Sequence, residues 1–468
     1  MAISIKSIGG SFNEVPNVTN LKVTAFGQNT IDIEYKIEDV ELTICRHYLY
    51  VNGGKKEITK EVGYESDTNV FKHKITGLKM NTPYTIQIGA SDGLDEGLSK
   101  AIQQTTKNYQ LFGVRVMENN SNPSTCCTYI EDAVGISVAT PTSLGGWADK
   151  FPFNKIRIVG FKNGTVTKEI KPSNKTQYTD GSTVPTDVDV MVEIPKVYWK
   201  FTNITNGYEM RISNYKIDSS YDCYAHKVGG VEKDFIYVGA YLGYNEGGKL
   251  RSKSGVSPTT SATLTHFRTY ANNVGSGYQQ WNWFTLLLLQ NLYLLAYKNL
   301  NSQNALGYGY VNRNSNKTNT GGTNTKGMVF GETGGKQQMC FLGIEDFWGN
   351  LYQFVDGMKL NGYNIMVATN NKSFNNSASG YENVGTTSSL GVRIDKVAHT
   401  NKGGFFPMST NGSDTTYYCD YGSANSDCFG ITGGSKADGL GAGAFCLSVG
   451  YSASGQDSFV GSRLVFLG

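Results

Sequence analysis

One stretch of the sequence limits the fold more than any other: WFTLLLLQNLYLLAY, from Trp283 to Tyr297. Apolar residues occupy nearly every side of a helix drawn over positions 279–299, so such a helix has no polar face to turn toward water. The apolar run is about 15 residues long and contains Gln290 and Asn291, which leaves it short of the ~20 residues needed to span a bilayer. We therefore predict a helix enclosed by a large core, and no membrane insertion.

The rest of the chain has the composition of a turn-rich β protein. The 468 residues include 56 Gly, 29 Tyr and 22 Phe but only 10 Pro, and a chain of this length is expected to form two or three domains. One hairpin is explicit, because the runs IRIVGFK and TVTKEI flank a turn at Lys162, Asn163 and Gly164. The predicted fold class is mainly β with one long buried helix.

Charge and polarity set further limits. Lys and Arg number 42 and Asp and Glu 39, a net charge of +3, and no basic run occurs, which argues against nucleic acid as a partner. The opening MAISIKSIGGSFNEVPN lacks the continuous apolar segment of a secretory signal, so we expect synthesis in a cytoplasm. The polar segment 312–327, NRNSNKTNTGGTNTKG, is expected to be a surface loop.

Residues 15–107 predict a small β-sandwich. Runs such as TIDIEYKI, VFKHKITGL and YTIQIGAS alternate apolar and polar residues between Gly, Asn and Asp turns, which is typical of such folds. The second half resembles a fibronectin type III domain through Leu78, Thr82, Tyr84, Ile86, Ile88, Ala90, Gly97 and Ser99. By that resemblance Tyr84 is the tyrosine corner, Tyr35 is the nearest counterpart of the usual tryptophan of the second strand, and the domain is a spacer.

The motif GIEDFWGNLYQFVDGM (343–358) is the most specific in the sequence. It resembles the DxxGNxWEW signature of the formylglycine-generating-enzyme branch of the C-type lectin fold. The matching positions are Asp346, Gly349 and Asn350, with Tyr352, Gln353 and Phe354 at the Trp, Glu and Trp positions. We expect Asp346 and Asn350 to serve the fold by satisfying buried backbone groups, and Trp348 to lie in the core.

The ending GSRLVF resembles the closing strand of the same fold through Gly461 and Arg463. Both motifs occur in the order and spacing of that family. The resemblance implies a C-type-lectin-like (formylglycine-generating-enzyme-like) α+β domain at 201–468, preceded by a β-rich base at 108–200.

Together with DVMVEIPKVYWKF (189–201), these motifs resemble a phage tail-tip or tropism-determinant-like protein. The resemblance covers about residues 108–468 and implies a bacteriophage host-recognition adhesin that binds a bacterial surface glycan or protein. It further implies a homotrimer in the virion, at a tail tip or fibre, made in the cytoplasm of the bacterial host. Residues 1–14 are then an arm that attaches to virion tail or baseplate proteins. A structural fibre or decoration protein of the virion head is the alternative binding role.

The expected receptor-binding surface lies in two stretches, 410–430 and 449–459. Aromatic rings, which give contact area at low entropic cost, alternate there with small polar groups whose hydrogen bonds adapt to a partner. The candidate receptor-binding residues are Tyr417, Tyr418, Asp420, Tyr421, Asn425, Phe429, Tyr451, Asp457 and Phe459.

Catalytic and metal-binding motifs are missing from the sequence. The five histidines form no HExxH, and no GxSxG, Walker or dinucleotide motif occurs, so we predict no enzyme activity, no cofactor and no metal. Two enzyme alternatives stay open. A copper-dependent oxidase would need Cys419 and Cys428 to converge on one ion, and a glycan depolymerase would need two carboxylates brought together by the fold. Most of the eight cysteines are expected to be reduced core thiols, although Cys428 and Cys446 could cross-link in an oxidising medium.

Overall fold

The computed structural model describes residues 15–38, 46–107, 109–312 and 316–468. Strands make up 41% of the chain and helices 9%, which confirms the predicted mainly β class. The chain divides into two compact units, Met1–Gln110 and Leu111–Gly468. None of the described helices is long and apolar enough to cross a membrane. The expected attachment arm, 1–14, lies outside the described residues.

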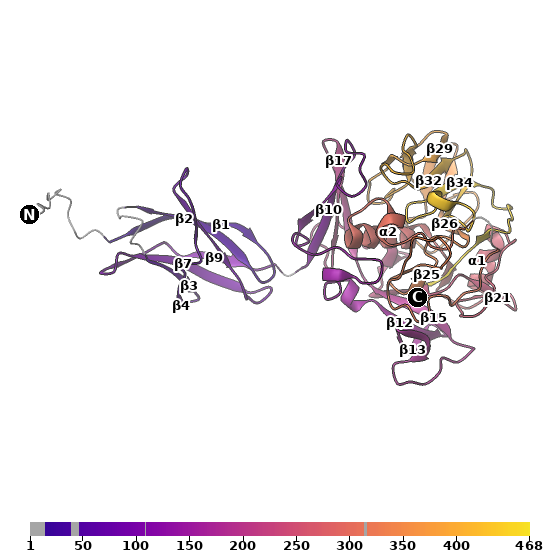
Figure 1. The fold of residues 1–468 in the computed structure, drawn as a ribbon, viewed down its shortest axis with the longest axis horizontal. Coiled ribbons are helices and arrows are strands. Elements are labelled where there is room, and N and C mark those ends of the chain that lie inside the picture. Colours follow the sequence, from indigo (N-terminus) through magenta and orange to yellow (C-terminus); the bar gives the residue numbers. More distant parts are fainter. Residues whose placement is uncertain (1–14, 39–45, 108, 313–315) are drawn as a thin grey trace, which may run out of the picture. The chain divides into compact units, whose positions relative to one another are not determined.

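The smaller unit consists of two β layers (Figure 1). Alternation along the chain produces it, because every second residue of β2 (Ile31–Glu38) is buried and the residues between are not. One sheet contains β1 (Asn17–Phe26), β2, β6 (Val70–Ile75) and β5 (Gly63–Glu65), in that order. The other contains β4 (Gly54–Glu57), β3 (Arg46–Val51), β7 (Pro83–Ser91) and β8 (Glu96–Leu98), with β9 (Ile102–Thr105) also paired to β7.

Tyr35 lies in the core of this unit. Its ring stacks on Phe71 with the centroids 5.6 Å apart, and its hydroxyl is hydrogen-bonded to His47 Nδ1 at 2.7 Å. Burial lowers the pKa of His47 to about 4, so the imidazole is neutral at pH 7.

Three sheets build the larger unit. The first contains β11 (Cys127–Glu131), β10 (Leu111–Met117), β17 (Gly207–Ser213) and β16 (Tyr198–Ile204). The second contains β14 (Asn174–Tyr178), β13 (Thr165–Lys171), β12 (Arg157–Lys162), β15 (Asp189–Pro195), β20 (Phe235–Gly239), β36 (Leu464–Phe466) and β23 (Tyr278–Gln280). The third contains β28 (Glu382–Thr386), β27 (Asn364–Val367), β26 (Tyr352–Asn361), β33 (Phe429–Thr432), β34 (Leu447–Tyr451), β32 (Tyr421–Ala424) and β29 (Leu390–Arg393), and β35 (Val460–Gly461) joins β26.

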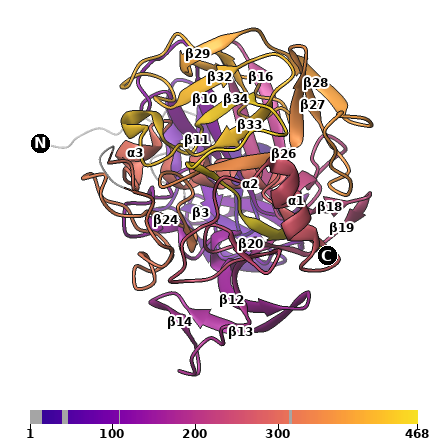
Figure 2. The same ribbon diagram turned by 90° about the vertical axis from the view of Figure 1, so that its right-hand side faces the viewer.

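Short two-stranded pairs and helical turns connect these sheets. The pairs are β18 (Lys227–Val228) with β19 (Val231–Glu232), β21 (Tyr244–Glu246) with β22 (Lys249–Arg251), β24 (Cys340–Phe341) with β25 (Ile344–Glu345), and β30 (Lys396–Val397) with β31 (Pro407–Ser409). Single 3₁₀ turns span Gly145–Trp147, Phe153–Lys155, Tyr224–His226 and Gly439–Gly441. The third sheet and the β12–β14 hairpins lie at opposite ends of the larger unit in both views (Figures 1 and 2).

The expected boundary at residue 200 is wrong. The strand β16 runs through it, and β15 from the expected base pairs with β20 from the expected lectin-like part, Val192 opposite Val238. The base and the rest of the larger unit therefore share one sheet and one core. The predicted hairpin is confirmed, since Lys162 pairs with Thr165 and the two residues between them, Asn163 and Gly164, have positive φ.

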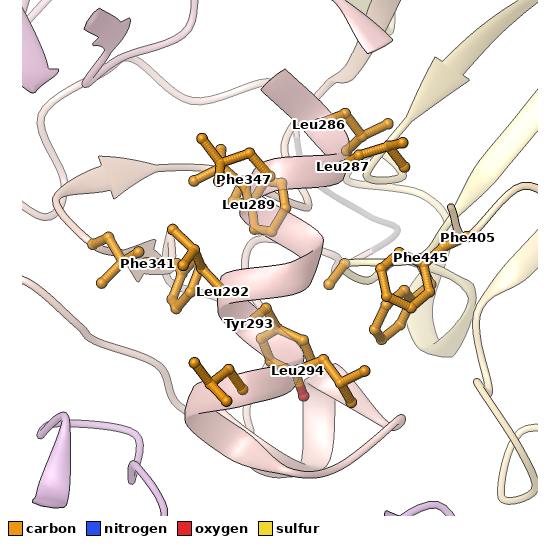
Figure 3. Close-up of a cluster of buried hydrophobic side chains, with 14 of the residues drawn as sticks. Leu286, Leu287, Leu289, Leu292, Tyr293, Leu294, Phe341, Phe347, Phe405 and Phe445 are labelled. Carbon is orange, nitrogen blue, oxygen red and sulfur yellow. The ribbon is translucent and has the colours of Figure 1, made fainter. Parts of the chain in front are cut away.

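The predicted buried helix is α2 (Trp283–Tyr297), and every one of its residues is buried. It begins where the Asn282 side chain accepts a hydrogen bond from Thr285 N and ends at Lys298 in the left-handed conformation. Its side chains point in several directions, toward Phe341 and Phe347 on one side and Phe405 and Phe445 on another (Figure 3). A helix without a polar face thus forms the centre around which the larger unit packs.

Two further helices are short. The helix α1 (Leu264–Asn272) begins with a capping box in which the Thr263 side chain accepts from His266 N, and it buries Leu264, Phe267 and Ala271. The helix α3 (Ser302–Ala305) is a single turn.

Candidate functional site

Six residues of the two sequence motifs lie in the core of the larger unit: Asp346, Trp348, Gly349, Asn350, Gly461 and Arg463. Arg463, between β35 and β36, is completely buried. Its Nε donates to Gln353 Oε1 at 2.8 Å and its Nη1 to the Gly239 carbonyl at 2.8 Å. Its Nη2 donates to the carbonyls of Glu345 (2.7 Å) and Asp346 (3.0 Å). One guanidinium therefore joins β20, β25 and β26.

Asp346 and Asn350 extend this network. Asp346 Oδ2 accepts from Asn350 Nδ2 at 2.8 Å and from Gln338 Nε2 at 2.6 Å. Asn350 in turn binds the backbone of Thr318, accepting from its N at 3.0 Å and donating to its O at 3.2 Å. Burial raises the pKa of the Asp346 carboxyl well above its usual range and lowers that of Arg463 to about 10.

Trp348, Gly349 and Gly461 complete the motif residues. Trp348 Nε1 donates to the Gly307 carbonyl at 3.1 Å. Gly349 has φ near +80°, and a Cβ there would lie 2.9 Å from Tyr310 N, so the position requires glycine. All six residues are buried, and they position the surrounding loops without contacting solvent.

The described part of the polar segment, residues 312 and 316–327, is only partly a surface loop, which corrects the expectation from its composition. Thr320 and Thr323 are buried, and the segment supplies hydrogen-bond donors to the buried Glu345. Glu345 Oε1 accepts from Gly321 N and Oε2 from Thr323 N, each at 2.7 Å. The buried Lys175 also donates to Thr323 Oγ1 at 3.1 Å. Small polar residues are needed here because a buried carboxylate must be hydrogen-bonded.

Three of the nine candidate receptor-binding residues are buried, so their expected contact with a receptor is wrong for this conformation. The Tyr418 hydroxyl is hydrogen-bonded to that of Tyr208 at 2.8 Å, and its ring meets Phe445 edge-on at 5.1 Å. Asp420 Oδ2 accepts from Phe445 N at 2.8 Å, and burial raises the pKa of this carboxyl well above its usual range. Phe429 in β33 is 2% exposed. Tyr418, Asp420 and Phe429 are therefore part of the core and stabilise the loops that we expected to bind a receptor.

The other six candidates are partly or fully exposed, and five of them lie in or next to β32, β34 and the loop that follows β34. Tyr421, Tyr451 and Phe459 are half-buried against the same buried cluster. The Tyr451 hydroxyl donates to the half-buried Asp457 at 3.4 Å, and Asn425 at the end of β32 is exposed beside Gly450 of β34. We name these five residues the outer face. All five are partly or fully exposed, and their part in receptor binding stays a prediction.

Tyr417 does not join the outer face. It packs against the main core, which also contains α2, and its N donates to the Ser121 carbonyl at 2.7 Å. The candidate residues therefore do not form the single surface that we expected. Tyr417 and Cys419 both have positive φ and turn the chain sharply before β32.

The cysteines do not form the sites considered from the sequence. Cys428 and Cys446 are both free thiols, as are the other five cysteines in the described residues. Within the third sheet Thr432 lies opposite Leu447 and Phe429 opposite Tyr451. Cys428 immediately precedes β33 and Cys446 immediately precedes β34, so the two lie at opposite ends of this antiparallel pair. Cys419 precedes β32, which runs parallel to β34. It therefore lies toward the Cys446 end, away from Cys428, and the two thiols of the considered copper site do not converge.

One group of metal-ligand residues was not predicted. Ligand atoms of Asp222, Cys223 and Glu232 lie within 4.8 Å of one another. Both carboxylates are already engaged, Asp222 by Lys227 Nζ at 2.5 Å and Glu232 by the Tyr198 hydroxyl at 2.5 Å. Burial raises the pKa of the Cys223 thiol to about 12, so it is protonated at pH 7. The group functions as an ion-pair and hydrogen-bond cluster.

Two cavities were also not predicted from the sequence. Cavity A has a volume of about 590 Å³ and lies between β16, Tyr224 and the segments 382–384 and 399–402. Its one lining carboxylate, Glu382, is paired with Lys402 Nζ at 2.6 Å. Cavity B, of about 690 Å³, lies beside α1 and is lined by no carboxylate side chain. Neither cavity offers the two carboxylates of a typical glycoside hydrolase.

No protein-family model matches the chain, and no curated protein matches it. Among solved structures, a family 28 exopolygalacturonase of Yersinia enterocolitica aligns at 18% identity over 20% of each chain, with a TM-score of 0.16. The chitinase ChiA74 of Bacillus thuringiensis aligns at 17% identity over 44% of this chain and 27% of its own, with a TM-score of 0.17. A chimeric titin Z1Z2 tandem aligns at 9% identity over 48% of this chain and 90% of its own, with a TM-score of 0.16.

Proposed function

We propose that this chain is a bacteriophage host-recognition adhesin that binds a bacterial surface glycan or protein through the outer face. The observation that carries the proposal is the outer face itself. Three half-buried rings, Tyr421, Tyr451 and Phe459, are held against a buried cluster with small polar groups beside them. Anchored rings beside adaptable polar groups suit recognition rather than catalysis.

The proposal extends to the domain families. For the smaller unit, a fibronectin type III assignment is supported by two packed sheets and by Tyr84, whose hydroxyl accepts from Lys79 N at 2.7 Å, the hydrogen bond of a tyrosine corner. For the larger unit, a C-type-lectin-like assignment of the formylglycine-generating-enzyme type is supported by the direct bonding of its two motifs, Arg463 to Gln353 and Asp346. In this account the smaller unit is a spacer without a site of its own.

The chain acts as a homotrimer in the virion, attached to tail or baseplate proteins through residues 1–14. Several weak sites on one particle reinforce each other, because the first contact raises the local concentration of the others. Light scattering after size exclusion tests the assembly. The expected mass is three times the 51.1 kDa of one chain, and a monomer would contradict the trimer.

The binding test uses the full chain, fluorescently labelled, on a panel of Gram-positive bacteria. Ser458, between Asp457 and Phe459, and Asn425 are exposed, so Ser458→Arg and Asn425→Arg obstruct the outer face without entering the core. Ser173→Arg is the matched control, because Ser173 is exposed between β13 and β14 at the other end of the unit.

We expect strain-selective binding that weakens at least about tenfold, or ~1.4 kcal/mol, in the two outer-face variants and not in the control. Equal binding by all three variants would remove the outer face from recognition. Binding to no strain by a folded trimer would favour a structural or decoration role in the virion head.

A further inference from the structure

Cavity B is lined by positively charged side chains that have no part in the receptor binding proposed for the outer face. It lies beside the C-terminal part of α1, where β18, β19 and the chain end also meet (Figure 2). Its walls include Lys233, Arg268, Lys372, Ser276, Ser373 and Phe374. Every charged side chain in the lining is cationic.

Of the three cations, Arg268 is already neutralised. Its Nε and Nη2 donate to the buried carboxylate of Asp356, each at 2.8 Å, and its Nη1 donates to Asn376 Oδ1 at 3.0 Å. This fixed guanidinium forms part of the wall, and its positive charge adds little to the cavity.

Lys233 and Lys372, unlike Arg268, are not neutralised by any side-chain carboxylate that the structure describes. Across the described residues neither ammonium group has a carboxylate within ion-pair distance, although Lys233 is half-buried. The two acidic neighbours of Lys233 in sequence, Glu232 and Asp234, are instead paired with Lys196 Nζ, at 3.4 and 3.1 Å. Lys372 is exposed, and the lining also contains the chain end at Gly468, whose terminal carboxylate offsets one of the two charges. The cavity keeps a net positive charge, which favours an anion.

The remaining walls indicate what kind of anion would fit. The hydroxyl groups of Ser276 and Ser373 can donate to oxyanion oxygens, and Lys acts as a point charge toward phosphate. A volume of about 690 Å³ exceeds what a bare phosphate needs, and the half-buried Phe374 ring offers an apolar contact for an organic group.

We infer that cavity B binds a phosphate-bearing organic ligand, such as a sugar phosphate or a polyol phosphate, with Lys233 and Lys372 on the phosphate and Phe374 against the organic part. The ligand is either a free monoester or a unit of a phosphodiester polymer on a bacterial surface. The site does not require the outer face, because none of the five outer-face residues lines the cavity.

The test is isothermal titration calorimetry on the full chain with glucose 6-phosphate, a glycerol phosphate oligomer, inorganic phosphate and glucose. The variant is Lys233→Gln with Lys372→Gln. The control is Lys155→Gln with Lys249→Gln, which removes the same charge from two exposed lysines outside the cavity.

We expect saturable binding of a phosphorylated ligand that weakens at least about tenfold in the cavity variant and less than about twofold in the control. Raising salt from about 0.05 M to about 0.5 M should weaken wild-type binding, because the attraction is electrostatic. Tighter binding of the oligomer than of glucose 6-phosphate would identify a polymer as the ligand, and the reverse would identify a free monoester.

Two results would overturn the inference: no binding of any phosphorylated probe, or equal weakening in the cavity variant and the control. A sugar phosphate that binds no more tightly than inorganic phosphate would remove the role given to Phe374. Ser458→Arg should leave phosphate binding unchanged, so failure of this site and failure of the outer face are separate results.

Discussion

Replacing Arg463 by Met should be among the most destabilising single changes in the larger unit. Methionine fills much of the volume but donates no hydrogen bond, so four acceptors each lose one: Gln353 Oε1 and the carbonyls of Gly239, Glu345 and Asp346. Burying a polar group without a partner costs about 1–3 kcal/mol, and removing one member of a buried charge network costs about 3–5 kcal/mol. We expect a loss of about 3–5 kcal/mol, a large share of the ~5–15 kcal/mol typical of a folded protein.

Urea unfolding followed by tryptophan fluorescence measures this loss of stability in the larger unit alone. All five tryptophans, at positions 147, 199, 281, 283 and 348, belong to the larger unit, so the signal does not report on the smaller one. Arg463→Lys should fall between wild type and Arg463→Met, because an ammonium keeps the charge but cannot reach acceptors in three directions. Lys155→Met, at an exposed position, is the control and should cost less than about 0.5 kcal/mol. An Arg463→Met variant within ~1 kcal/mol of wild type would refute the role given to this network.

Three further predictions concern other parts of the molecule. Burial lowers the pKa of His226 from 6.5 to about 4, so the unfolded state takes up a proton first as pH falls. The contribution of His226 to the stability of the larger unit should be complete above pH 6.5 and fall by about 3 kcal/mol between pH 6.5 and 4; His226→Gln should remove that part of the pH dependence in urea titrations, and an unchanged slope would count against it. Tyr84→Phe removes the acceptor for Lys79 N and should speed hydrogen exchange of that amide while costing about 1 kcal/mol; unaltered exchange would contradict this. Asn282→Ala removes the cap of α2 and should cost about 0.5–2 kcal/mol by tryptophan fluorescence, whereas no measurable loss would mean that packing alone starts the helix.

The sequence predicted the elements whose structure is determined by residues close together in the chain. The apolar run predicted α2 because no other arrangement hides so many leucines, and Asn163-Gly164 predicted its hairpin because both residues accept positive φ. The helix α1 was missed although Leu264, Phe267 and Ala271 recur at helical spacing. It has only nine residues, and its capping box uses His266 in place of the usual Glu or Gln.

The candidate site was predictable only in part. Composition located the aromatic loops, but it could not distinguish the buried Tyr418 from the half-buried Tyr417 beside it, because a turn with positive φ sets which ring enters the core. The polar segment 312–327 was expected outside because its partner, the buried Glu345, is distant in sequence. The cavities depend on such long-range arrangements as well, since Lys233 and Lys372 line one cavity although they are far apart in the sequence.

The central claim, that the outer face recognises a bacterial surface, is tested most directly by competition. Labelled wild-type chain is bound to a responsive strain, and unlabelled wild type, Ser458→Arg or Ser173→Arg is added in increasing amounts. The account predicts displacement by wild type and Ser173→Arg at equal concentrations, and a requirement for at least about tenfold more Ser458→Arg. Displacement by Ser458→Arg at the wild-type concentration would contradict it and would mean that the chain binds cells through another surface.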